Sequence, residues 1–268
     1  MMLGSKAFDP SDTGSRMGVP SEEKLEEQYE RAIAQGADPE FVKYTKGGMT
    51  GVIGILRCGE GEHCDVRVTD IDDRGLEGMA CTVTTGQAAY RLETAAPGRH
   101  MVYPMAMAAA IGERLGLTAA EIAAGTAAYA PVGSRMHLIR MDGDRLVIDD
   151  CYNANPQAME AALEILADTA CRRRVAVLGD MGELGPISRD AHLQVGRTTA
   201  RLGLDAVIAI GPKAAAIAET AGPRAQHFAA IEEALPALRR EFTPGTAVLV
   251  KASHAMDFGK IVSELEKM

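Results

Sequence analysis

Three short segments of the sequence place polar groups directly after an apolar run. They are "RLVIDDCYNANP" (145–156), "VLGDMGELG" (177–185) and "VLVKASH" (248–254). Each apolar run is typical of a buried strand. Ligands of open parallel sheets bind at the carboxyl ends of the strands, because backbone N–H groups and helix N-termini converge there. Groups at such positions could bind a phosphate, a ribose hydroxyl, a metal ion or an anionic substrate.

The first segment holds more polar groups than a helix start requires. Asn155 is a natural N-cap and Pro156 a natural first helical residue, so both have a structural explanation. The residues beyond that requirement are Asp149, Asp150, Tyr152 and Asn153. Their carboxylates could bind a ribose hydroxyl or a metal, and the amide could hold a phosphate or a peptide group.

The other two segments leave structural and functional interpretations open. Asp180 and Glu183 lie in a glycine-rich loop before a predicted helix that starts near Ser188. They could form an ordinary turn or part of a site. His192 follows within the helix, where a packed side chain is the commoner role. Lys251 could meet an anionic substrate or extend along the surface.

The segments that position these groups predict an α/β fold. Strand-like runs "RLVIDD", "RVAVLGD", "DAVIAIG" and "TAVLVKA" alternate with helical segments. This alternation predicts a doubly wound, Rossmann-like and mostly parallel sheet of five or six strands over residues 136–268. Pro236 falls inside one helical pattern and is expected to kink that helix or to restart it.

The region before residue 136 has a different pattern. Residues 65–94 alternate apolar and polar side chains, which predicts antiparallel strands. Two helices follow, over about 100–116 and 118–129, with Thr118 as N-cap of the second. A hairpin is expected to turn at Asp142-Gly143. Residues 1–20 are interpreted as loop or disorder, and a helix is predicted over 21–36.

Composition excludes several classes of protein. The formal net charge is −9, and "CRRRV" is the only tight basic run, which argues against nucleic-acid binding. We interpret that run as a helix–strand connection. The five cysteines show no framework spacing, and "CGEGEHC" is interpreted as a polar turn rather than a zinc site. The sequence has no signal peptide and no membrane-spanning run, so we expect a cytoplasmic location.

The polar segments, taken in order, resemble a known family. "DDCYNANP", then "AVLGDMGELG" with His192, then "VLVKAS" resemble the C-terminal domain of the Mur ligase family. Upstream, "APGRHMVY" and "APVGSRM" resemble the last part of that family's central domain. The resemblance covers roughly residues 60–268. It implies domain limits of 1–20 for a loop, 21–135 for a truncated α/β remnant of the central domain, and 136–268 for the C-terminal domain.

This resemblance implies an ATP-dependent ligase of peptidoglycan precursor synthesis that uses ATP and magnesium. The implied reaction adds D-alanyl-D-alanine to UDP-N-acetylmuramoyl-tripeptide through an acyl-phosphate. The residues that it assigns to nucleotide or phosphate are His100, Arg135, Asp150 and Asn153. The residues that it assigns to the substrate side are Tyr152, Asn155, Lys251 and Ser253. It assigns no metal ligand within this sequence.

The sequence also departs from the family's pattern. The phosphate loop Gly-x-x-Gly-Lys-Thr is absent, since in "TKGGMTGVIG" Lys46 precedes the glycines. The UDP-binding domain has no counterpart before residue 60. The family usually has Asn where Met101 and Pro104 stand, and "KGS" reads "KAS", followed by His254. The chain alone is therefore expected to lack activity.

Three hypotheses follow. The chain could be one half of a split ligase whose phosphate loop comes from a second polypeptide. It could be a non-catalytic module that binds a peptide or a UDP-linked cell-wall precursor. It could also be a different enzyme that uses the remaining polar strand ends. Apolar faces left by a truncated central domain would need a cover, which residues 20–56 or a second copy in a homo-oligomer could provide.

Overall fold

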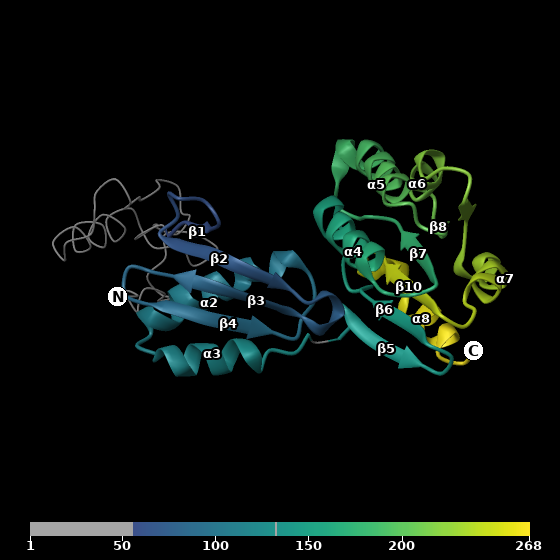
Figure 1. Cartoon of the computed structure of the whole chain (residues 1–268). Coiled ribbons are helices and arrows are strands. Elements are labelled where there is room, and N and C mark those ends of the chain that lie inside the picture. Colours follow the sequence, from purple (N-terminus) through teal and green to yellow (C-terminus); the bar gives the residue numbers. More distant parts are fainter. Residues whose placement is uncertain (1–55, 132) are drawn as a thin grey trace, which may run out of the picture. The chain divides into compact units, whose positions relative to one another are not determined.

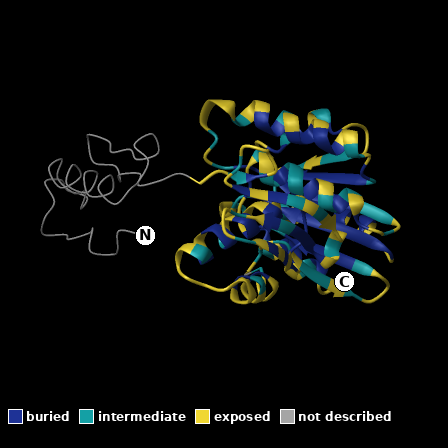
Figure 2. Cartoon of the chain, turned by 60° about the vertical axis from the view of Figure 1, so that its left-hand side comes forward, coloured by how far each residue is buried: buried dark blue, intermediate teal, exposed yellow. Residues whose placement is uncertain are grey.

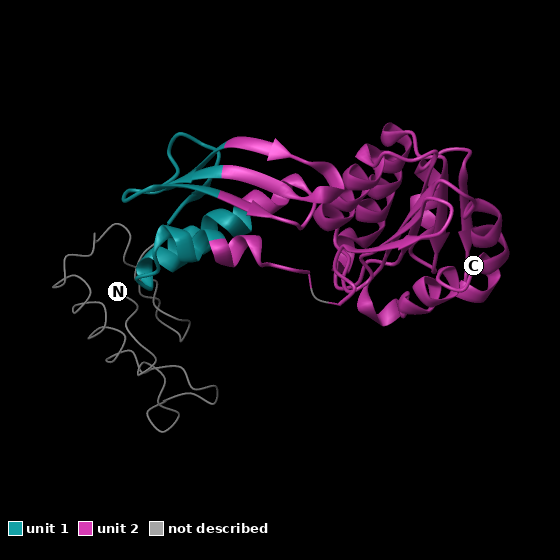
Figure 3. Ribbon diagram, turned by 60° about the horizontal axis from the view of Figure 1, so that its bottom comes forward, with its two compact units in different colours: residues 1–69, 82–91, 103–123 teal, residues 70–81, 92–102, 124–268 magenta. Residues whose placement is uncertain are grey.

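The computed structural model describes residues 56–131 and 133–268. The expectations for residues 1–20, for a helix over 21–36 and for the segment around Lys46 lie outside the described residues. The chain divides into two compact units (Figure 3). One comprises 82–91, 103–123 and the described part of 1–69, and the other comprises 70–81, 92–102 and 124–268.

A six-stranded sheet forms the centre of the larger unit (Figure 1). Its strands are β5 (His137–Met141), β6 (Arg145–Asp149), β7 (Arg173–Gly179), β8 (Ala206–Ile210), β9 (Ala225–Phe228) and β10 (Thr246–Lys251), in the spatial order β5-β6-β10-β7-β8-β9. All neighbours from β6 to β9 pair in parallel. The edge strand β5 pairs antiparallel with β6 through the predicted hairpin. The predicted mostly parallel sheet is confirmed.

Helices cover both faces of this sheet. The helices are α4 (Pro156–Asp168), α5 (Ser188–Leu202), α6 (Ala215–Thr220), α7 (Ile231–Glu241) and α8 (Gly259–Leu265). Side chains of α4, α5 and α6 share one buried cluster with alternate strand residues such as Ala176 and Leu249. Side chains of α7 and α8 share a second cluster with the intervening residues, such as Val175 and Val248. The fold is therefore doubly wound.

Burial on both faces explains the unbroken apolar runs of the central strands. All six residues of β10 are buried, and the five residues of β8 are buried as well (Figure 2). Each of these strands hydrogen-bonds to a neighbour on either side. Lys251 ends β10 within this buried layer, so its charge needs a partner close by.

A second sheet precedes the large one in the chain. Its strands are β1 (Cys58–Gly59), β2 (Val66–Asp73), β3 (Met79–Thr84) and β4 (Ala89–Thr94), in that spatial order. The β2–β3 connection closes with a 3.0 Å hydrogen bond from Arg74 N–H to Gly78 O. The β3–β4 connection closes with a 2.9 Å bond from Thr85 N–H to Ala88 O. These tight connections agree with the predicted antiparallel strands.

Two helices follow the second sheet, and one of them leaves an apolar stripe exposed. A 3-10 turn over Arg99–Met101 leads into α2 (Val102–Arg114), and α3 covers Ala119–Ala127. Thr118 caps α3 as predicted, in a reciprocal capping box with Glu121. Tyr103, Met107 and Ile111 stand four residues apart on α2 and are 42%, 46% and 52% exposed. We refer to these three side chains as the α2 stripe.

One of the two alternatives predicted for Pro236 does not occur. Pro236 does not restart the helix, because α7 begins at Ile231 and continues through the proline to Glu241. Proline removes one backbone donor from the helix interior. Ala234, Ala237 and Leu238 pack into the core beneath the sheet and hold the helix on both sides of Pro236. Among the described residues, no helix is long and apolar enough to cross a bilayer.

Candidate functional site

The candidate site lies at the carboxyl ends of two neighbouring parallel strands, β6 and β10. Their register sets Val250 beside Asp149, so the residues that follow each strand lie close together. Lys251 Nζ lies 2.5 Å from Asp150 Oδ2, and the two side chains are 3% and 14% exposed. The sequence separated these residues by about a hundred positions, and the sheet order brings them together.

The Lys251 ammonium group makes all its hydrogen bonds to the loop that follows β6. Besides the Asp150 carboxylate, it donates to Asn153 O at 2.9 Å and reaches Asp150 O at 3.5 Å. An ammonium group has three hydrogens, and each has an acceptor here. The second carboxylate oxygen of Asp150 accepts the Met136 N–H at 3.1 Å. In this structure the pair fixes the loop conformation and adds no net charge to the site.

Arg135 supplies an exposed cation at the same edge. Its guanidinium carbon lies 4.1 Å from the centre of the Tyr152 ring, which favours a cation–π contact. The other neighbour of Tyr152 is His254, with ring centres 5.6 Å apart. The Tyr152 backbone N–H donates to Ser134 O at 3.0 Å, which holds the two loops together. The Arg135 charge is therefore positioned by an aromatic surface.

A pocket of about 480 Å³ lies beside these groups, and we call it the carboxyl-edge pocket. Six of the eight residues assigned by the family resemblance line it: His100, Arg135, Asp150, Asn153, Asn155 and Lys251. Its apolar wall includes Pro97, Met136 and Ala162. Tyr152 and Ser253 are not among the lining residues. A volume of this size is within the range that small-molecule ligands occupy.

The asparagines at this edge also serve the backbone. The Asn155 side chain accepts the Ala158 N–H at 2.8 Å and caps α4, with Pro156 in the first turn. The predicted structural role of these two residues is confirmed. Asn153 Oδ1 accepts the neighbouring Ala154 N–H at 2.8 Å, so its amide nitrogen is the group that it can offer to a ligand.

The environment of His100 disfavours its charged form. Desolvation by the surrounding protein lowers the pKa of the imidazole, and Lys251 acts in the same direction. Asp150 opposes this shift, because its carboxylate favours the imidazolium. His100 as a residue still exposes part of its surface. A neutral, partly exposed ring is suited to stacking or hydrogen bonding rather than to anion binding.

In and beside the glycine-rich loop after β7, the polar side chains accept hydrogen bonds from backbone N–H groups. The Asp180 carboxylate accepts the N–H groups of Lys213 and Ala214 at 3.0 and 2.7 Å. His192 is fully buried, accepts the Met181 N–H at Nε2 and lies 2.6 Å from Ser188 O through Nδ1. Both residues thus have structural roles here, which was the alternative interpretation of each.

The side chains of Ser253 and Asp149 also accept hydrogen bonds from nearby groups of the protein. Ser253 Oγ accepts the Gly182 N–H at 2.7 Å and so links the loops after β7 and β10. Asp149 Oδ1 accepts a 2.9 Å hydrogen bond from the Cys151 thiol. Burial and this carboxylate together raise the pKa of Cys151 to about 12. Among the described residues, no three His, Cys, Asp or Glu side chains gather as a metal site would require.

Sequence reasoning missed the ion pair between Lys251 and Asp150 and assigned the two residues to different ligands. A signal was available, since a lysine that closes a wholly apolar strand needs a buried acid to neutralise it. Met136 and Gln157, which line the pocket, were also missed. Their side chains are ordinary surface or packing types that give no sequence signal.

Residues 134–254 match the family model described as Mur ligase, glutamate ligase domain. The six-stranded sheet lies within the matched region, whereas His100 and helix α8 lie outside it. This region of the chain is therefore similar to the glutamate ligase domain of Mur ligases.

The curated relatives are UDP-N-acetylmuramoyl-tripeptide–D-alanyl-D-alanine ligases. The Escherichia coli enzyme is 36% identical over 174 residues, covering 64% of this chain and 38% of the relative. The Bacillus subtilis enzyme is 29% identical over 265 residues, covering 95% of this chain and 56% of the relative. The similarity thus extends before residue 60, beyond the range expected from the motifs. The chain spans about half or less of the length of these relatives.

Solved structures agree with this relationship. MurF from Acinetobacter baumannii superposes with a TM-score of 0.71 at 29% identity, over 78% of this chain and 46% of that one. MurF ligase from Thermotoga maritima, solved in complex with ADP, superposes with a TM-score of 0.64 at 23% identity, over 77% and 47%. The second likeness supports the fold alone, and its bound ADP is a property of that protein.

Proposed function

We propose that this chain supplies the nucleotide-facing and dipeptide-facing wall of an ATP-dependent ligase that joins D-alanyl-D-alanine to a UDP-linked muramoyl tripeptide. The observation that carries the proposal is the carboxyl-edge pocket, where Arg135, Asn153 and His100 meet at the sheet edge that open α/β folds use for ligands. The similarity to the named ligases supplies the reaction class.

In this proposal each residue has a limited task. Arg135 neutralises a phosphate of the nucleotide, since its guanidinium is exposed and held against Tyr152. The neutral His100 ring lies near the adenine. Lys251 and Asp150 act as positioning residues that hold the loop bearing Asn153. ATP would supply the phosphoryl group that activates the acid for attack by the amine.

The described carboxylates do not fit a magnesium site at this pocket. Asp150 is its only acidic lining residue, and its oxygens bind Lys251 and the Met136 N–H. Magnesium needs open oxygen ligands in octahedral geometry. A magnesium ion would therefore need ligands outside this pocket.

We further propose that the phosphate loop comes from a second polypeptide. Residues 1–268 contain no Gly-x-x-Gly-Lys-Thr segment, which the proposed phosphoryl transfer would require. The α2 stripe is the surface that we assign to this partner, because contiguous exposed apolar side chains on a helix favour a protein interface. A self-associating chain whose Ile111→Asp variant becomes monomeric would instead assign the stripe to a second copy.

Nucleotide titration tests the pocket. Isothermal calorimetry with ATP should show binding to the full chain, and Arg135→Gln should weaken it about tenfold, the loss of one charge-assisted hydrogen bond. Arg189→Gln is the matched control, since Arg189 is exposed, pairs with Glu219 of α6 and does not line the pocket. Equal affinities for Arg135→Gln and Arg189→Gln would refute the assignment of Arg135.

A second candidate, a binding module that works without nucleotide, is favoured by one observation. The Lys251–Asp150 pair is neutral as a unit, which leaves Arg135 as the lining group whose charge could bind the carboxylate of a dipeptide. Calorimetry with D-alanyl-D-alanine in the absence of ATP separates the two functions. Binding that ATP does not strengthen favours the module, whereas ATP-dependent binding together with a phosphate-loop polypeptide favours the ligase.

A further inference from the structure

A second pocket lies at the opposite, amino edge of the same sheet. It has a volume of about 440 Å³ and is formed by the turn between β5 and β6 and by the segments that lead into β7 and β10. In the sheet order, β6, β10 and β7 are neighbours, so these three connections meet side by side. We call this cavity the amino-edge pocket. None of its lining residues belongs to the carboxyl-edge pocket.

Three arginines line this pocket in a protein whose net charge is −9. They are Arg140, Arg145 and Arg172. Asp144 is the acidic residue among the lining residues, and Asp142 follows the lining residue Met141; Glu77 lies with its carboxylate 3.1 Å from Arg140. That ion pair is exposed on both sides and is screened by solvent. Among the lining residues themselves, three arginines stand against one aspartate.

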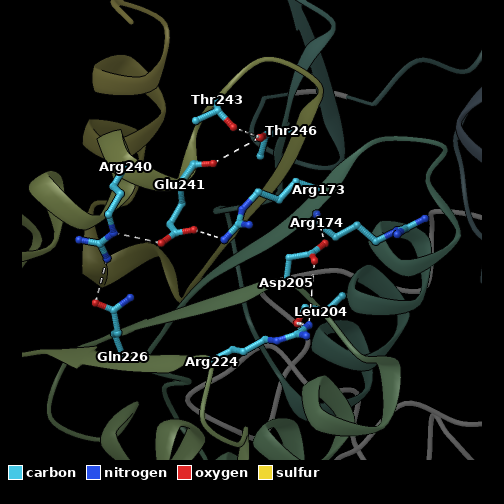
Figure 4. A network of polar contacts seen from close by, with 10 residues as sticks. All are labelled: Arg173, Arg174, Leu204, Asp205, Arg224, Gln226, Arg240, Glu241, Thr243 and Thr246. Atoms are coloured by element: carbon cyan, nitrogen blue, oxygen red, sulfur yellow. Dashed lines mark hydrogen bonds and ion pairs between the residues drawn. The ribbon is translucent and has the colours of Figure 1, made fainter.

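Arg172 differs from its neighbours in the basic run "CRRRV". Figure 4 shows the Arg173 guanidinium against the Glu241 carboxylate, and Asp205 accepting the Arg174 backbone N–H. The Arg174 side chain donates to Thr169 O at 3.0 Å. Two of the three arginines thus have structural partners. Within the part of the chain that the structure describes, no carboxylate lies at ion-pair distance from Arg172.

The stem of Arg172 is held in place by the backbone of the next loop. Arg172 N–H donates to Gly245 O at 2.9 Å, and Gly245 N–H donates to Gly143 O at 2.8 Å. Gly245 has a φ of +79°, and a Cβ there would lie 2.7 Å from Arg172 Cδ. A glycine at this position therefore leaves room for the arginine stem.

Arg145 is also fixed before any ligand arrives. Its guanidinium lies 5.2 Å from the centre of the Phe242 ring, and its Nε donates to Asp142 O at 2.8 Å. These contacts leave its terminal nitrogens available as donors. A planar guanidinium binds phosphate or carboxylate through paired hydrogen bonds, and a pre-positioned one loses less entropy on binding.

We propose that the amino-edge pocket binds a compact polyanion, such as a phosphorylated or polycarboxylate small molecule, through Arg172 and Arg145. This site is separate from the proposed ligase pocket and does not depend on it. Its ligand would contact the connections into β6, β7 and β10 together and would hold these three strands at their amino ends.

The test maps binding of pyrophosphate and of citrate to the full chain by amide NMR at fixed ionic strength. The amides of Gly143, Gly245 and Arg172 should shift in a saturable manner. Arg172→Gln should weaken this response about tenfold or more, which corresponds to about 1.4 kcal/mol. The anion that binds more tightly identifies the preferred group.

Two control variants separate this site from others. Arg201→Gln removes an equal charge from an exposed pair with Glu160 and should leave the response unchanged. Arg135→Gln, at the carboxyl-edge pocket, should also leave it unchanged, whatever its effect on ATP. The proposal is overturned if neither anion shifts these amides, or if Arg172→Gln and Arg201→Gln weaken the response equally.

Discussion

The buried pair of Lys251 and Asp150 should be a principal support of the large unit, and Lys251→Met tests this. Methionine keeps the length of the side chain and removes its charge. Two unit charges 2.5 Å apart attract by about 7 kcal/mol at an effective dielectric of about 20, before desolvation is subtracted. Removing one partner of a buried pair costs about 3–5 kcal/mol, because the other charge is left without a counter-ion.

The expected loss lies at the lower end of that range, about 3 kcal/mol. Asp150 is 14% exposed and keeps its hydrogen bond from the Met136 N–H, so water and the backbone relieve part of the penalty. The double variant Lys251→Met/Asp150→Asn should lose less than the sum of the single variants, with an interaction free energy of about 2 kcal/mol. Lys260→Met removes a lysine from an exposed pair with Asp257 and should leave stability almost unchanged.

Native-state amide exchange is the suitable assay, because the amides of Val248 and Val250 in β10 report the opening of this sheet without averaging over both units. Urea unfolding followed by circular dichroism provides a second measurement of the same free energy. If Lys251→Met slows or accelerates exchange in β10 no more than Lys260→Met does, the ion pair is not a support of the fold and our reasoning is refuted.

Two further predictions concern titrating groups. The proton NMR titration of His100 should have a midpoint below that of an ordinary histidine, and Asp150→Asn should lower it further, since the carboxylate favours the charged ring. Because the folded state holds this proton less tightly than the unfolded state, His100 should reduce stability as the pH falls through the unfolded pKa of about 6.5; a midpoint that rises in Asp150→Asn contradicts this. The Cys151 thiol, whose pKa is about 12, should remain unmodified by iodoacetamide at pH 8 after the less buried Cys64 has reacted, as read by mass spectrometry of the full chain. Equal rates for the two thiols would show that Cys151 is neither buried nor bound to Asp149.

The sequence predicted the fold of the second half well, for a physical reason. Strands covered on both faces must be apolar throughout, and the helices that cover them must be amphipathic. The continuous apolar runs of the strands and the helical spacing of apolar residues can therefore both be recognised in the sequence. The capping of α4 by Asn155 and of α3 by Thr118 was predictable because capping depends on residues only three positions apart.

The contacts that depend on strand order could not be predicted in the same way. Nothing in the sequence says that β10 lies between β6 and β7, and this placement alone brings Lys251 to Asp150. The same limit explains Asp180, whose carboxylate is occupied by amides more than thirty residues away. Pro236 shows a different limit. The helix continues through it because neighbouring residues pack into the core, and helix propensity calculated from the local sequence takes no account of such packing.

The position of β10 has a consequence for how this protein is made. β10 comes last among the described strands along the chain but lies between β6 and β7. These two strands therefore have no shared hydrogen-bonding partner until Thr246–Lys251 has left the ribosome. Until then, the edges of β6 and β7 that will pair with β10 are open, and they must not pair with other strands while the intervening helices are translated. A chain truncated before Thr246 would lack the middle of the sheet rather than its margin.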